Sequence, residues 1–257
     1  MLKNTLNSFA IAVLDEDLNK AGYTRIGTAW YKIEQDVILS VELRKLPYRS
    51  FDITFGILPF SCFENLKLNI SYLQGDLKYW KDHKQYYIEK YGLPHSDDPR
   101  FRWSPDHTVR TLNDPNGYAL LFEFWSGFYY DVIKPHISVV HDLQSALDSI
   151  GSYLAKQIND SRPKFYWPDH APAFMKLGCP EKALPYLKNC VELKLKDNEL
   201  DVDSVELLAK PAWQVGKLNY SFVWYWLIVN NDIEKMQIVV ESNEQAAREW
   251  IKVKIKQ

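Results

Sequence analysis

The sequence predicts an α+β fold, in which a mixed or antiparallel sheet of about four or more strands is packed by helices and followed by a helical C-terminal region. Two observations predict the core. Apolar residues recur every three or four positions at 2–21 and 139–158, and they alternate with polar residues at 36–58. A third observation predicts that the chain divides into two regions. A proline-rich stretch at 163–172 precedes a part of the chain in which apolar residues have mainly helical spacing.

Domain boundaries follow from the same changes in pattern. We expect an α+β core domain at 1–160 and a helical C-terminal region at 161–257. Inside the core domain the periodicity blurs, and residues at about 60–113 are rich in aromatic residues, histidine and proline. This segment is therefore expected to be an insertion, with its proline-rich second half a loop.

The first element is predicted to be an amphipathic helix over residues 2–21. Its apolar residues form one stripe at a period of 3.6, and Gly22 follows as the residue type that most easily ends a helix in a left-handed conformation. The stripe consists of Leu2, Leu6, Phe9, Ala10, Val13, Leu14, Leu18 and Ala21. We expect this helix to cover the apolar face of the sheet.

Four segments are predicted to be strands. Residues 23–33 have a β-rich composition, while 37–44 and 51–57 alternate between apolar and polar side chains, as strands with one covered face do. The segment 117–125 is almost continuously apolar. That pattern predicts a buried, central strand.

Helical patterns return after Pro135. The clearest helix is predicted at 139–158, and an αα-hairpin is predicted after the proline-rich stretch, with Gly178 ending its first helix and Pro180 in the first turn of its second. Ser242 and Gln245 match a capping box, which predicts that the last helix begins there.

A family resemblance rests mainly on glycine and aromatic residues in the first and third predicted strands. The chain resembles the bacterial domain of unknown function 4304 family over residues 1 to about 160. The matching positions are Gly22, Tyr23, Arg25, Gly27 and Trp30, then Phe51, Ile53, Phe55, Gly56 and Ile57. The resemblance carries over no catalytic residue. It implies an association with bacterial toxin and immunity loci, which favours a binding role.

Composition narrows the classes of function. The formal net charge of −2 gives no overall attraction to nucleic acid phosphates. Cys62, Cys179 and Cys190 lack the spacing of a zinc knuckle or a disulfide framework, which indicates a reducing compartment. The apolar runs are shorter than the roughly 20 residues of a membrane span. We expect a cytoplasmic protein without a membrane partner or a cofactor, and the sequence leaves its oligomeric state open.

Histidines and carboxylates give one candidate for chemistry. In the segment from His95 to His107, Asp97, Asp98 and Asp106 accompany the two histidines, and such groups are ligands for divalent ions. Turns and caps explain the same residue types in a proline-rich loop. We therefore predict no metal and no catalytic residue. The alternative function is an enzyme that acts on a small molecule or nucleic acid through this loop.

The favoured function is a non-enzymatic protein-interaction module, of the immunity type or an accessory protein, that binds a toxin-like or other partner. Arginine, tryptophan and tyrosine dominate the energetics of protein interfaces, and the predicted insertion is rich in them. The candidate binding residues are Arg100, Arg102, Trp103, Trp80, Tyr87 and Tyr91, with Tyr86 beside them. At least half of these aromatic side chains are expected to be packing residues.

Overall fold

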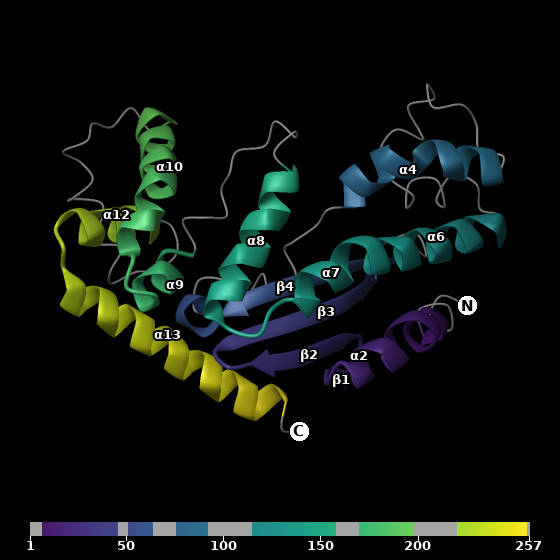
Figure 1. The fold of residues 1–257 in the computed structure, drawn as a ribbon, viewed down its shortest axis with the longest axis horizontal. Helices are drawn as coiled ribbons and strands as arrows, with labels where there is room; N and C mark the ends of the chain where they lie inside the picture. Colours follow the sequence, from purple (N-terminus) through teal and green to yellow (C-terminus); the bar gives the residue numbers. More distant parts are fainter. Residues whose placement is uncertain are drawn as a thin grey trace. The chain divides into compact units, whose positions relative to one another are not determined.

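The computed structural model describes residues 7–45, 51–63, 76–91, 115–157, 170–197 and 220–255 (Figure 1). The predicted α+β class is confirmed, since a four-stranded antiparallel sheet is accompanied by helices and the C-terminal region is helical. The chain divides into two compact units. The first comprises Met1–Glu34, Ile38–Ile57 and Asn69–Val140, and the second comprises Gln35–Val37, Leu58–Leu68 and His141–Gln257.

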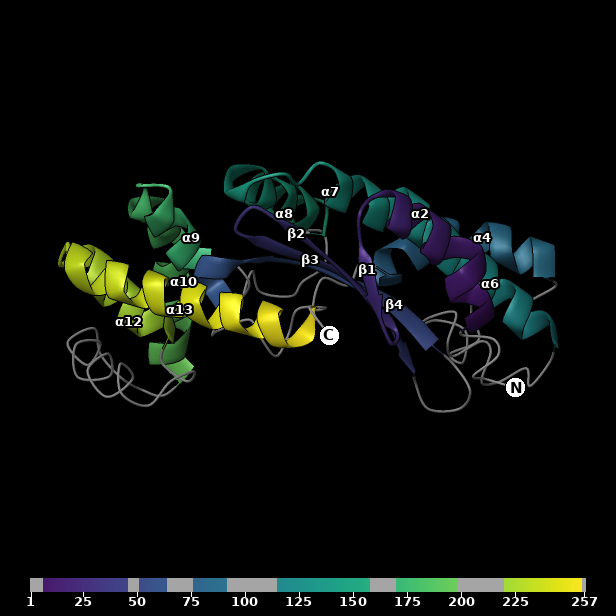
Figure 2. The ribbon, with the colours of Figure 1, turned by 90° about the horizontal axis from the view of Figure 1, so that it is seen from below.

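The strands of the sheet follow the order of the chain, as Figure 1 shows, and Figure 2 shows the same strands turned by 90°. Its strands are β1 (Thr24–Ile26), β2 (Ala29–Glu34), β3 (Val37–Lys45) and β4 (Phe51–Pro59). The prediction of one strand at 23–33 was wrong, because β1 and β2 pair here with Ile26 opposite Ala29. Gly27 has a φ of +65°, and glycine at the first position of a two-residue turn allows the tight return. Residues with high β propensity lie on both sides of this turn, so the sequence pattern alone does not show where the first strand ends.

The N-terminal helix ends where the sequence predicts. Its described part contains a π-helical segment, η1 (Ala10–Asp15), and then α2 (Glu16–Lys20). Gly22 has a φ of +86°. The backbone N–H of Tyr23 donates to the Leu18 carbonyl at 2.9 Å, and that of Gly22 donates to the Asn19 carbonyl at 3.0 Å. This is the hydrogen-bond pattern of a Schellman motif, so the predicted stop at Gly22 is confirmed.

The first unit packs helices on one face of β4. The ring of Phe9, just before η1, lies 5.1 Å from that of Phe51, and the ring of His136 lies 6.3 Å from that of Phe55. Phe51 and Phe55 are four residues apart on a strand and so point to the same face. The N-terminal helix therefore covers the apolar face, as expected, together with the helix that carries His136.

The strand predicted at 117–125 was wrong, because this segment is helical. Helix α6 (Pro115–Phe128) continues through a π-helical segment, η5 (Tyr129–Ile133), into α7 (Lys134–Ser138). Its buried residues follow one another at helical steps: Leu120, Leu121, Phe124, Trp125 and Phe128. A continuous apolar run has neither period, so periodicity alone does not separate a buried strand from a buried helix. The predicted insertion contains a further helix, α4 (Asp76–Tyr91).

The second unit is mainly helical in its described part. Its elements are η3 (Phe60–Cys62), α8 (Leu143–Gln157), α9 (Ala171–Lys176), η7 (Pro180–Ala183), α10 (Leu184–Asp197), α12 (Tyr220–Val229) and α13 (Ile233–Lys254). The helix predicted at 139–158 is confirmed over α8. It begins later than predicted because the Asp142 carboxylate accepts a hydrogen bond from the Ser145 N–H at 2.8 Å, as an N-cap does.

The predicted αα-hairpin is confirmed around Gly178 and Pro180. Gly178 has a φ of +74°, and the N–H of Cys179 donates to the Phe174 carbonyl at 3.0 Å, which ends α9. Pro180 then opens η7, which leads into α10. Helices α9, α10, α12 and α13 share a core. Its buried residues include Ala171, Leu187, Val191, Phe222, Trp224, Leu227 and Met236.

The helix start predicted at Ser242 was wrong, because α13 passes through this residue without interruption. Its N-cap is Asp232, whose carboxylate accepts a hydrogen bond from the Lys235 N–H at 3.3 Å. Asn231, with a φ of +51°, ends the preceding helix. The pattern Ser-x-x-Gln also occurs inside helices. It therefore marks a helix start only where the residues before it are not helical. Among the helices that the structure describes, none has the length and apolarity to cross a membrane.

Candidate functional site

Helices α4 and α6 of the first unit contain the described part of the predicted binding segment. They pack through aromatic rings around Phe124, whose ring lies 5.4 Å from Tyr79, 5.8 Å from Trp80 and 5.9 Å from Tyr87. A side chain larger than hydrogen at Gly127 would overlap the hydroxyl of Tyr79. The two helices therefore approach closely, and one face of α4 is committed to packing.

The same helix pair carries the Glu123 cluster, which we define as Glu123 of α6 with Tyr86, Lys90 and Tyr91 of α4. The Tyr86 hydroxyl donates to Glu123 Oε1 at 2.7 Å, and Lys90 Nζ donates to the same oxygen at 2.7 Å. Tyr91 donates to Oε2. Lys90 Nζ also donates to the Tyr86 hydroxyl oxygen at 2.9 Å. One carboxylate thus fixes three side chains of α4.

Electrostatics keep this carboxylate charged. Burial acts to raise the pKa of Glu123, but the hydrogen bonds from Lys90, Tyr91 and Tyr86 outweigh it and hold the pKa below its ordinary value. Burial and the neighbouring Glu123 raise the pKa of Tyr91 to about 12. The Tyr91 hydroxyl therefore remains a protonated donor at neutral pH, and the glutamate remains its acceptor.

Tyr86 is the exposed member of the aromatic set. Half of its surface, 50 %, is exposed, whereas Trp80 and Tyr87 are buried at 2 % and 3 %. Its ring also meets that of Tyr87 edge to face, with centroids 5.1 Å apart. The structure thus places Trp80 and Tyr87 in the packing between α4 and α6. Tyr91 is partly exposed within the Glu123 cluster.

The other predicted site residues lie outside the described residues. These are Arg100, Arg102 and Trp103, and the loop of the alternative enzyme function from His95 to His107. Sequence reasoning missed Lys90 and Glu123. The spacing of Tyr86 and Lys90 at i and i+4 is a signal of a shared helix face, but Glu123 lies in the segment that the sequence predicts to be a strand.

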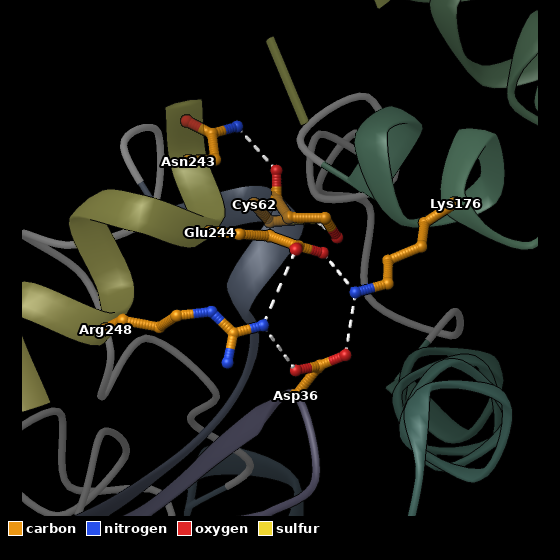
Figure 3. Close-up of polar contacts among 7 residues, drawn as sticks. Asp36, Cys62, Lys176, Asn243, Glu244 and Arg248 are labelled. Atoms are coloured by element: carbon orange, nitrogen blue, oxygen red, sulfur yellow. Dashed lines mark hydrogen bonds and ion pairs between the residues drawn. The ribbon is translucent and has the colours of Figure 1, made fainter. Parts of the chain in front are cut away.

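The second unit contains a different polar cluster, the four-charge ring of Asp36, Lys176, Glu244 and Arg248 (Figure 3). Lys176 Nζ lies 2.7 Å from Asp36 Oδ2 and is also paired with Glu244. Arg248 Nη2 lies 3.1 Å from Asp36 Oδ1 and 3.7 Å from Glu244 Oε2. Positive and negative groups therefore alternate around a closed ring, and each charge faces two of opposite sign.

Contacts between α13 and η3 support the four-charge ring. Asn243, adjacent to Glu244 on α13, is buried and its amide donates to the backbone carbonyl of Ser61 in η3 (Figure 3). The guanidinium carbon of Arg248 lies 5.4 Å from the ring centroid of Phe60. Burial acts to raise the pKa of Asp36, but Lys176 and Arg248 outweigh it and lower the pKa. The four-charge ring is therefore held in place by surrounding residues of the second unit.

Within the described ranges, no three His, Cys, Asp or Glu side chains come together as a metal site would require. No protein-family model, curated protein or solved structure matches the chain. The resemblance to the domain of unknown function 4304 family therefore stays a prediction. The candidate site that geometry supports is a surface, formed by Tyr86 and the residues that hold it.

Proposed function

We propose that the protein is a non-enzymatic cytoplasmic protein-interaction module, of the immunity or accessory type, that binds a partner protein through Tyr86 on α4. A single observation carries this proposal. The Tyr86 ring is half exposed, yet its hydroxyl is held by Glu123 and Lys90 and its ring by Tyr87. An exposed aromatic side chain in a fixed position is well suited to be an interface anchor.

Two physical effects favour such a residue. Tyrosine combines apolar area with a polar end, and it is enriched among the few residues that dominate interface energetics. Binding also immobilises side chains, at about 0.5–1.5 kcal/mol for each flexible one. Because three contacts already restrain Tyr86, less of this cost remains to be met on binding. The resemblance to a family associated with toxin and immunity loci favours the same function.

Site-specific photo-crosslinking in the host cell tests the proposal. A benzophenone amino acid at position 86 should capture one partner protein, and the same amino acid at position 130 should not. Tyr130 is the matched control, since it is 45 % exposed and has Lys134 beside its ring, but lies on η5. Tyr86→Ala should abolish co-purification of that partner and Tyr130→Ala should retain it.

The opposite results would reject the proposal. These are full co-purification by Tyr86→Ala, or equal capture at both positions. Turnover of a small molecule or nucleic acid by the purified protein, lost on replacement of His95 or His107, would establish the alternative enzyme function instead.

A further inference from the structure

The turn between β2 and β3 contains a strained residue. Gln35 has a φ of +48°, and Asn231 is the other non-glycine residue of the described chain with a positive φ. Asparagine tolerates this conformation because its short side chain bonds to nearby backbone, whereas glutamine has no such preference. Strain of this kind persists where surrounding contacts hold the backbone in place.

The neighbouring residue supplies those contacts. The two carboxylate oxygens of Asp36 face Lys176 on α9 and Arg248 on α13, at 2.7 Å and 3.1 Å. Its backbone carbonyl accepts a hydrogen bond from the N–H of Phe60 at 2.8 Å. The strained turn is thus attached to three elements of the second unit through a single residue.

The two cationic arms of the ring differ. The Lys176 side chain is 27 % exposed and contacts both carboxylates closely. The Arg248 side chain is 53 % exposed, and its contacts are longer. Because water and salt weaken exposed ion pairs most, the Arg248 arm is the weaker one. Its departure would uncover Asp36 and the ring of Phe60 together.

We propose that the four-charge ring is an ionic latch that holds the β2–β3 turn in its strained conformation, and that Arg248 is the arm through which it opens. Salt, or an acidic group that competes for the guanidinium, releases Arg248, and the turn then relaxes at Gln35. The Phe60 N–H loses its acceptor in the same event. This inference is independent of the proposed function, because it involves neither Tyr86 nor α4.

Amide hydrogen exchange of the full-length protein tests the latch, with the Phe60 N–H as its reporter. Arg248→Gln should accelerate exchange at Phe60 about two- to fivefold, the range expected for a partly exposed ion pair. The Cys179 N–H, which ends α9, should be unaffected. High salt should accelerate Phe60 exchange in the wild type and have little further effect in Arg248→Gln.

The strain is tested by Gln35→Gly with Asn231→Gly as its matched control. Gln35→Gly should slow exchange at Phe60 several-fold and partly rescue Arg248→Gln, because glycine removes the strain of the latched state. Asn231→Gly should leave Phe60 unchanged. Unaltered Phe60 exchange in Arg248→Gln, or faster exchange in Gln35→Gly, would overturn the proposal. So would Phe60 exchange that occurs only together with Cys179, since the latch would then not open locally.

Discussion

The Glu123 cluster and the four-charge ring both gather donors around carboxylates, yet they differ in where those donors come from. All three donors to Glu123 belong to α4, within residues 86–91, and they leave an aromatic ring half exposed. The four-charge ring instead joins residues 36, 176, 244 and 248, and each of its charged groups is paired with two groups of opposite charge. A local cluster of this kind shapes a surface, whereas a ring closed over such sequence distances stabilises a fold.

The largest expected effect on stability distinguishes the residues that pack between α4 and α6 from the exposed residue Tyr86. Phe124→Ala should lower the free energy of unfolding by about 3–5 kcal/mol, because it removes the ring on which Tyr79, Trp80 and Tyr87 pack. Tyr86→Ala should lower it by less than about 1 kcal/mol, as expected for a surface residue. Urea denaturation measures both values. Equal losses of unfolding free energy would mean that Tyr86 is a packing residue, so that the Glu123 cluster would no longer differ from a structural cluster.

The next effect concerns the ring. Lys176→Met leaves the carboxylates of Asp36 and Glu244 with Arg248 alone, and should cost about 1–2 kcal/mol for this partly buried network. Lys188→Met is the control, since Lys188 pairs with Glu192 at 3.9 Å in an exposed i,i+4 contact and should be nearly neutral. Thermal unfolding of the two variants compares them. A loss in Lys176→Met no larger than in Lys188→Met would show that the ring does not stabilise the unit.

A smaller effect on stability is expected at Glu123. Glu123→Gln keeps the shape but removes the charge that orients Tyr86, Lys90 and Tyr91, so stability should fall by less than about 1 kcal/mol. The Tyr86 ring should become more mobile, which NMR line shapes and relaxation of its ring protons would detect. Unchanged ring dynamics in this variant would mean that Tyr87 alone positions Tyr86.

Lowering the pH should reduce the stability that both the four-charge ring and the Glu123 cluster contribute. The folded-state pKa values of Asp36 and Glu123 lie below their ordinary values of 3.8 and 4.5, so these groups stabilise the protein above those values. That contribution is lost as the pH falls through the lowered pKa values. Asp36→Asn should therefore reduce the dependence of the melting temperature on pH in this acidic range. An unchanged profile would show that Asp36 has the same pKa in the folded and unfolded chain.

The sequence predicted those features that depend on local pattern. The existence of β3 and β4, the helical period of α8 and the left-handed stops at Gly22 and Gly178 each follow from neighbouring residues, and the structure contains them. The expectation of one covered face in these strands was wrong, because Ile38, Ser40 and Thr54 on the other face are buried as well. The strand predicted at 117–125 failed because a continuously apolar run carries no period.

The candidate sites were less predictable for a related reason. Tyr86 and Lys90 share a helix face, which the sequence can show, but their acceptor Glu123 lies in the segment mistaken for a strand. Asp36, Lys176 and Arg248 belong to no common motif. Only the folded second unit brings them together, so local reasoning could not have found the ring.

The most direct test compares Tyr86→Ala with Lys176→Met in one experiment, which measures affinity for the captured partner alongside the melting temperature of each variant. Tyr86→Ala should lose the partner while keeping its melting temperature, and Lys176→Met should melt earlier while binding with unchanged affinity below its transition. Full binding by Tyr86→Ala, or loss of binding by folded Lys176→Met, would contradict the assignment of contact to one cluster and stability to the other.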